Sequence, residues 1–165
     1  MSGRVQIRNT ALALSVAEID AGTIDRANAY QATRVAMRAA VESLMMAPDH
    51  LLIDAMRVDH PCRQTKLIYR DALCLSIPAA SVVAKVHRDR LTRELDALHP
   101  GYGLASHKDY GTPEHRHALA EIGPCALHRW SLAPVRLVDP DAEMEDWVSA
   151  ELLSEDADLE DAEWA

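Results

Sequence analysis

The sequence has no apolar run that approaches the roughly 18 residues a membrane-spanning helix needs. Its first ten residues include two arginines and no apolar stretch, so they do not predict a signal peptide. Hydrophobic residues make up 48% of the chain, which is typical of a folded protein rather than a disordered one. The length of 165 residues is sufficient for one domain.

Cysteine is also scarce. Cys62, Cys74 and Cys125 are odd in number, lie far apart and form no C-x-x-C pair. A disulfide framework and a structural zinc site both need paired or clustered cysteines. The sequence therefore predicts reduced thiols and a cytoplasmic location.

Positive charge is missing from the C-terminal end. From Asp139 onward there are twelve acidic residues and no Lys or Arg, which leaves residues 1–138 with 14 acids against 17 bases, a net charge of +3. A mildly basic body suits a polyanionic partner, although an ordinary protein surface can have the same balance. We expect residues 1–138 to form a domain and residues 139–165 to form an acidic tail that like charges keep solvated and mobile.

Alternating strand and helix signals place the body in the α/β class. Thr23 or Asp25 is expected to cap the helix at 27–45, and Thr112 to cap the helix at 113–122. The hydrophobic patterns predict strands at 5–14, 50–54 and 66–69, a helical turn at 16–20, and helices at 27–45, 76–98 and 113–122, with a further helix near 144–153.

Two aspartates follow predicted strands. Asp54 ends the apolar run 50–54, and Asp71 comes shortly after the strand 66–69. Functional groups gather beyond the C-terminal ends of parallel strands, so the two carboxylates converge if these strands are neighbours. Oxygen ligands suit Mg²⁺ or Mn²⁺, and the pair would form half of a two-metal site for phosphoryl transfer. The alternative is that each aspartate only forms a turn or caps a helix.

Four blocks of the sequence follow one another in a distinctive order. Residues 76–90 read SIPAASVVAKVHRDR, residues 100–112 read PGYGLASHKDYGT, and residues 128–135 read HRWSLAPV. Upstream lie residues 18–20, which read EID, and the later Asn28. These blocks resemble the S-I-A-A-A-S-I-L-A-K-V-x-R-D, P-x-Y-G-F-x-x-H-K-G-Y-G-T, H-R-x-S-F-x-P-V and E-I-D-x-x-N-I-type blocks of the ribonuclease HII family of prokaryotes. The resemblance covers roughly residues 8–136.

The resemblance implies an endoribonuclease that cleaves RNA in RNA–DNA hybrids, or cuts beside single ribonucleotides in duplex DNA, by two-metal hydrolysis. It implies a partial ribonuclease-H-like fold, a mixed sheet flanked by helices that lacks its first strands. By position, Asp54 and Asp71 correspond to the third and fourth of four catalytic carboxylates that bind two Mg²⁺ or Mn²⁺ ions.

The same resemblance suggests substrate-binding residues. Tyr110 matches a tyrosine that stacks on the sugar next to the ribonucleotide, although alone it reads as a surface aromatic. Lys85 and Arg88 share a helix face and can neutralise phosphate charge, although they can equally form a solvated helix face or a salt bridge to Asp54 or Asp71. Asn28 can donate to a phosphate oxygen, but it can equally cap a turn.

The chain also departs from the family pattern. The G-x-D-E-A-G-R-G motif, which holds the first two carboxylates, and a D-S-K-K-L-like block are absent. Arg70 replaces the glycine before Asp71, Asp109 replaces the glycine before Tyr110, and Leu132 replaces a phenylalanine in a chain that has none. We expect weak or no turnover by this chain alone, unless a separate N-terminal fragment completes it. Uncovered strand edges and apolar surface would favour association.

Two other functions remain open from the sequence. A nucleic-acid-binding remnant without catalysis would keep the basic helix and bind less tightly as salt rises. A protein-interaction module would use the acidic tail, either on a basic partner or as an autoinhibitory segment that covers the basic body.

Overall fold

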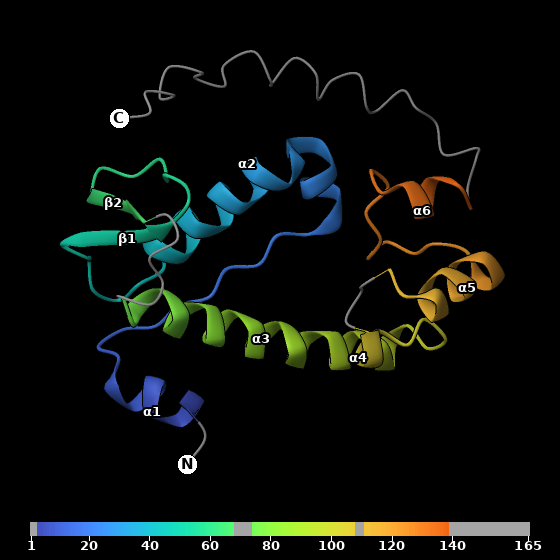
Figure 1. The fold of residues 1–165 in the computed structure, drawn as a ribbon, viewed down its shortest axis with the longest axis horizontal. Coiled ribbons are helices and arrows are strands. Elements are labelled where there is room, and N and C mark those ends of the chain that lie inside the picture. The colour runs from blue at the N-terminus through green and yellow to red at the C-terminus, as the bar shows by residue number, and fades with distance from the viewer. Residues whose placement is uncertain (1–2, 68–73, 108–110, 139–165) are drawn as a thin grey trace.

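The computed structural model describes residues 3–67, 74–107 and 111–138. It shows a small sheet flanked by helices, which confirms the predicted α/β class (Figure 1). In chain order the elements are α1 (Gly3–Thr10), α2 (Ala21–Glu42), β1 (His50–Asp54), β2 (Arg63–Leu67), α3 (Ser76–Leu98), α4 (Leu104–His107), α5 (Pro113–Ile122) and α6 (Ala133–Arg136).

The sheet consists of β1 and β2, which pair in parallel from His50 opposite Arg63 to Asp54 opposite Leu67. Side chains alternate between the two faces of β1, so Leu51 and Ile53 are buried while the residue between them is 44% exposed. The buried face packs on Val58 and on the C-terminal half of α2. The predicted strand 50–54 is confirmed, and the two strands are neighbours, as the proposed site requires.

Helix α3 has the bounds predicted for it, Ser76–Leu98, and its 23 residues span about 35 Å. In Figure 1 it runs from the sheet to the C-terminal elements, and it contacts both β1 and α4. Pro78 lies in its first turn, where no intrahelical N–H bond is lost. This helix connects the two ends of the structure.

A second core forms from the C-terminal helices. It contains Leu119, the most deeply buried large side chain described, which is 1% exposed, and it shares no residue with the core beside the sheet. The other buried members of this cluster are Tyr102, Leu104, Ala118 and Val135. Helix α5 begins as predicted, with the hydroxyl of Thr112 accepting a hydrogen bond from the His115 N–H at 3.3 Å. It ends at Gly123, whose φ of 74° favours glycine.

The N-terminal prediction was wrong. Residues 5–14 were expected to form a strand, but the structure has α1 there, and residues 11–20 have no regular structure, including the expected turn at 16–20. A strand must pair with a neighbour, and within the described residues β1 and β2 pair only with each other. A helix satisfies its N–H and C=O groups within its own segment, so α1 forms without a neighbouring strand.

The start of α2 also differs from the prediction. Its cap is Asp20, which accepts hydrogen bonds from the N–H and hydroxyl of Thr23, both at 2.8 Å, rather than Thr23 or Asp25. Asn28 interrupts the helix with φ 60° and ψ 164°. The segment after this interruption corresponds to the helix predicted from residue 27, although α2 ends at Glu42 rather than at residue 45.

The remaining differences are small or lie outside the described residues. Strand β2 occupies Arg63–Leu67, which begins three residues before the predicted strand 66–69. The acidic tail and its expected helix lie outside the described residues. Among the helices that are described, none has both the length and the apolar character needed to cross a membrane.

Candidate functional site

Asp54 is the last residue of β1, and its side chain is exposed at the C-terminal edge of the sheet. The next residue, Ala55, has a φ of 55°, and its N–H donates to the Leu67 carbonyl oxygen at 2.9 Å. A left-handed conformation is uncommon for a residue other than glycine. The chain therefore turns directly after Asp54 and leaves its carboxylate at the end of the strand.

The neighbouring strand ends at the same edge. Leu67 lies opposite Asp54 in the parallel register, so the chain that leaves β2 starts beside this carboxylate. Asp71 comes four residues later, within residues 68–73, which lie outside the described part of the chain. The pairing of adjacent parallel strands is confirmed, while the convergence of Asp54 with Asp71 stays a prediction.

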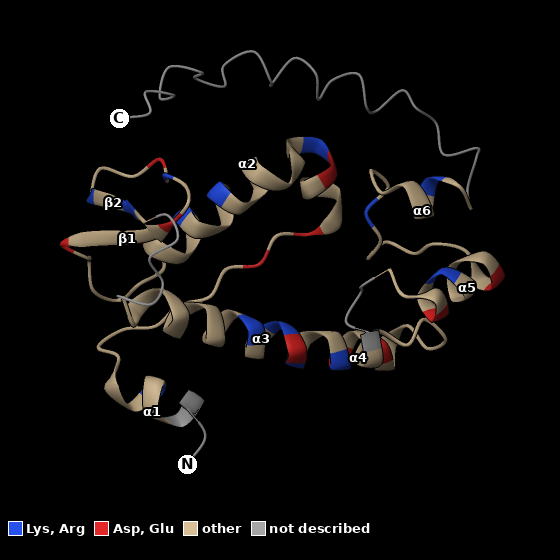
Figure 2. Ribbon diagram, in the orientation of Figure 1, with Lys and Arg blue, Asp and Glu red and all other residues tan. Residues whose placement is uncertain are grey.

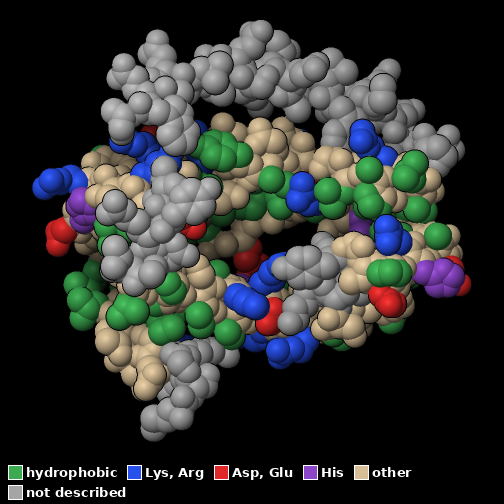
Figure 3. Space-filling model, viewed as in Figure 1, with side chains coloured by type: hydrophobic (Ala, Val, Ile, Leu, Met, Phe, Trp, Pro, Cys, Tyr) green, Lys and Arg blue, Asp and Glu red, His purple; other side chains and the backbone are tan. Residues whose placement is uncertain are grey.

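Helix α3 carries the predicted basic residues. Lys85 and Arg88 are both exposed and lie three positions apart. Figure 2 shows Lys and Arg positions along the middle and the C-terminal half of this helix, with acidic positions between them. In Figure 3 the Lys and Arg side chains lie below a hollow between α2 and α3. The predicted placement of both residues on one exposed helix is confirmed, and phosphate binding by them stays a prediction.

Asn28 has the capping role that the sequence left open. Its Oδ1 accepts a hydrogen bond from the Gln31 N–H at 3.0 Å and so caps the second segment of α2. Its side chain is exposed, and the amide NH₂ is the part of the group that can donate to a phosphate oxygen. Phosphate binding by Asn28 remains a prediction.

The structure adds a residue that the sequence reasoning had treated only as a possible cap. The Asp25 carboxylate accepts hydrogen bonds from the N–H of Trp130 at 2.6 Å and from the N–H and hydroxyl of Ser131 at 3.2 and 2.5 Å. The E-I-D-x-x-N-I pattern could have pointed to Asp25, because it places the aspartate three residues before the asparagine. Asp25 lies three residues before Asn28, whereas Asp20 lies eight residues before it.

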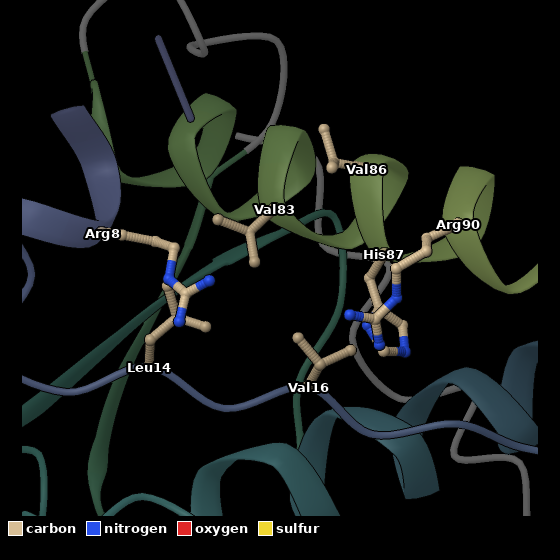
Figure 4. Close-up of a pocket in the computed structure, with 7 residues that line it drawn as sticks. All are labelled: Arg8, Leu14, Val16, Val83, Val86, His87 and Arg90. Atoms are coloured by element: carbon tan, nitrogen blue, oxygen red, sulfur yellow. The ribbon is translucent and has the colours of Figure 1, made fainter. Parts of the chain in front are cut away.

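Residues 11–20, which have no regular secondary structure, contact α3 through a side-chain pair. The Glu18 carboxylate contacts Nε2 of His87. A cavity of about 180 Å³ lies between this segment and α3 (Figure 4). Its lining combines apolar side chains with two arginines and a histidine: Arg8, Leu14, Val16, Val83, Val86, His87 and Arg90. None of the predicted site residues lines it, so this cavity is distinct from the edge at Asp54.

Two groups near these elements have shifted proton affinities. Hydrogen bonds from the hydroxyl and then the backbone N–H of Thr23 lower the pKa of Asp20. Hydrogen bonds from the backbone N–H groups of Ile77 and then Ser76, at the start of α3, lower the pKa of the Cys74 thiol. Backbone N–H groups at a helix start contribute to both shifts, because they stabilise a negative charge, and at Asp20 the Thr23 hydroxyl has the larger effect.

Of the two predicted metal ligands, Asp54 lies within the described residues and Asp71 does not. Asp54 is a hard oxygen donor of the kind that Mg²⁺ and Mn²⁺ prefer. Over residues 3–67, 74–107 and 111–138, no three His, Cys, Asp or Glu side chains cluster closely enough to hold a metal ion. Tyr110, like Asp71, lies outside these residues.

Comparisons with known sequences all point to one family. The sequence model of the family described as Ribonuclease HII matches residues 3–135. The chain is 52% identical over 136 residues to Ribonuclease HII of Solibacter usitatus, covering 82% of this chain and 59% of the relative. It is 48% identical over 153 residues to Ribonuclease HII of Koribacter versatilis, covering 93% of this chain and 59% of the relative. The chain therefore spans about three fifths of the length of these two relatives.

Comparison with solved structures supports the fold. The structure resembles that of the ribonuclease H2 from Pyrococcus horikoshii, with a TM-score of 0.62 and 18% sequence identity. The match covers 74% of this chain and 66% of the other. At this identity the likeness concerns the fold alone, and it agrees with the α/β architecture expected from the sequence.

Proposed function

Because the chain belongs to the ribonuclease HII family, we propose that it forms part of an endoribonuclease. The substrate would be RNA in an RNA–DNA hybrid, or a single ribonucleotide in duplex DNA. The reaction would be hydrolysis, in which water attacks phosphorus and the bond to the 3′-oxygen breaks. The observation that carries this proposal is the carboxylate of Asp54, exposed where β1 ends beside the parallel strand β2.

Asp54 and Asp71 would be metal ligands. The exposed carboxylate of Asp54 fits a hard divalent cation, Mg²⁺ or Mn²⁺, because such ions take oxygen ligands. When bound, two such ions supply an activated water and stabilise the leaving 3′-oxygen. Two carboxylates balance only half of the charge of two divalent ions. We therefore propose that full activity requires further carboxylates from an N-terminal ribonuclease HII fragment.

The remaining predicted residues would hold the substrate. Lys85 and Arg88 are exposed on α3, where they can neutralise phosphate charge. The Asn28 amide can donate to a phosphate oxygen, and Tyr110 would stack on the neighbouring sugar. We further propose residues 1–138 as the nuclease unit and residues 139–165 as an acidic tail. The three free cysteines support a cytoplasmic location.

A nicking assay on duplex DNA with one embedded ribonucleotide tests the proposal. The chain is assayed with Mn²⁺ or Mg²⁺, alone and together with an N-terminal ribonuclease HII fragment. The D54N variant is expected to lose about 100-fold or more in rate, because a metal ligand contributes several kcal/mol. The matched D49N variant, which makes the same change at an exposed aspartate just before β1, is expected to cleave at the wild-type rate.

The absence of cleavage both with and without the fragment would contradict the proposal. Duplex binding without cleavage in these samples would instead favour a non-catalytic nucleic-acid-binding role. Equal loss of activity in D54N and D49N would show that charge in general, rather than metal binding at the end of β1, governs the rate.

A further inference from the structure

Asp25 joins two parts of the chain that lie far apart in sequence. Its Oδ2 accepts from the Trp130 N–H, and its Oδ1 accepts from the N–H and hydroxyl of Ser131, across 105 and 106 residues. Both carboxylate oxygens are therefore engaged by donors from two consecutive residues. Hydrogen bonds to an ionised carboxylate are stronger than neutral ones, so this contact holds the start of α2 to the loop before α6.

The core beside the sheet and the C-terminal cluster share no described residue, and α3 contacts both β1 and α4. In Figure 1 the N-terminal end of α2 faces the side of the structure on which α6 lies. Asp25 thus provides a second connection, between α2 and the C-terminal region.

The same contact lies one helical turn before the interruption of α2. Asn28 follows Asp25 by three residues and has φ 60° and ψ 164°, a combination that residues other than glycine rarely adopt. Such conformations persist where surrounding contacts hold them. On one side of Asn28 is the Asp25 contact, and on the other is its own hydrogen bond from the Gln31 N–H.

We infer that Asp25 is a positioning residue for Asn28. By holding the first turn of α2 to Trp130 and Ser131, it keeps the Asn28 side-chain amide in one orientation, ready to donate to a phosphate oxygen of the nucleic acid. This inference rests on the proposed function, since it takes nucleic acid as the ligand of Asn28. Asp25 itself acts through Asn28 and does not contact the substrate.

Amide hydrogen exchange tests the positioning without any substrate. In D25N, an NH₂ group replaces an acceptor oxygen and cannot accept from a backbone N–H. Loss of the charge-assisted hydrogen bonds at Asp25 is expected to free the first turn of α2 and so to weaken the hydrogen bond from the Gln31 N–H to Asn28. The Gln31 amide is therefore expected to exchange about 10-fold faster than in wild type. The Val35 amide, one turn further along α2, and the D49N variant are the controls and are expected to stay near wild type. Unchanged protection at Gln31 in D25N would overturn the inference.

Duplex binding tests the link to nucleic acid. N28A and D25N are each expected to weaken binding of a ribonucleotide-containing duplex by about 10-fold. The double variant is expected to be no weaker than the single ones, because both changes remove the same contact. S131A, which keeps the two backbone donors to Asp25, is expected to fall between wild type and D25N. Additive losses in the double variant would overturn the inference and indicate a merely structural role.

The two experiments separate the inference from the function on which it rests. If the wild-type chain binds no duplex, or N28A binds as tightly as wild type, the nucleic-acid part of the inference is overturned together with the proposed role of Asn28. In either case the exchange rate of Gln31 still decides whether Asp25 positions Asn28.

Discussion

Replacement of Leu119 by alanine is predicted to destabilise the C-terminal cluster strongly. Leu119 is 1% exposed and belongs to the cluster with Tyr102, Leu104 and Val135. The substitution removes three buried carbon groups, which at about 0.8 kcal/mol each gives roughly 2.4 kcal/mol. Incomplete collapse of the cavity raises the expected loss toward about 4 kcal/mol.

Urea denaturation followed by circular dichroism measures this loss, and hydrogen exchange shows where it occurs. Leu98→Ala is the matched control, because Leu98 is 73% exposed at the end of α3 and its replacement is expected to cost less than about 0.5 kcal/mol. Exchange is expected to increase most in α5 and in the segments packed against it. A loss below about 1 kcal/mol for Leu119→Ala, or equal losses for the two variants, would refute the description of this cluster as a packed core.

Three further results are expected. Thr112→Ala removes the cap of α5 and is expected to lower the free energy of unfolding by about 1 kcal/mol in the same denaturation experiment. An unchanged free energy of unfolding would refute the capping role. Because the pKa of Asp20 is lowered on folding, its contribution is present above its ordinary value of 3.8 and is lost as the pH falls through the lowered pKa. The protection of the Thr23 amide, which is its exchange rate relative to that of an unstructured peptide at the same pH, is therefore expected to fall in acid for wild type but not for D20N, and identical protection profiles would contradict this. The lowered pKa of Cys74 predicts faster alkylation by iodoacetamide at pH 7.5 than at Cys62, as mass spectrometry of the labelled peptides can show.

The sequence could predict those parts of the candidate site that lie at the end of a strand or on the face of a helix. Asp54 was predicted as a site residue because an acid after a short apolar run is a local pattern, and the parallel pairing of β1 with β2 gives that pattern its expected setting. Lys85 and Arg88 were placed on an exposed helix by the same kind of local reasoning. The role of Asp25 was not found, because its three donors lie more than a hundred residues away.

Local chemistry in the sequence by itself determined α3, α5 and β1. A helix makes its hydrogen bonds within four residues, so Thr112, Pro113 and Gly123 suffice to mark where α5 begins and ends. The family was likewise readable from four blocks of sequence, which the match over residues 3–135 bears out.

Only the tertiary structure decided the N-terminal region and the connection at Asp25. Residues 5–14 contain side chains that a strand accepts, but a strand forms only where another strand supplies hydrogen-bond partners, and α1 formed there instead. Asp25 could have capped a helix, yet its carboxylate bonds to Trp130 and Ser131 because folding brings their donors to it. In the first case no partner strand lies within the described residues, and in the second the partners are distant in sequence, so no local pattern could decide either.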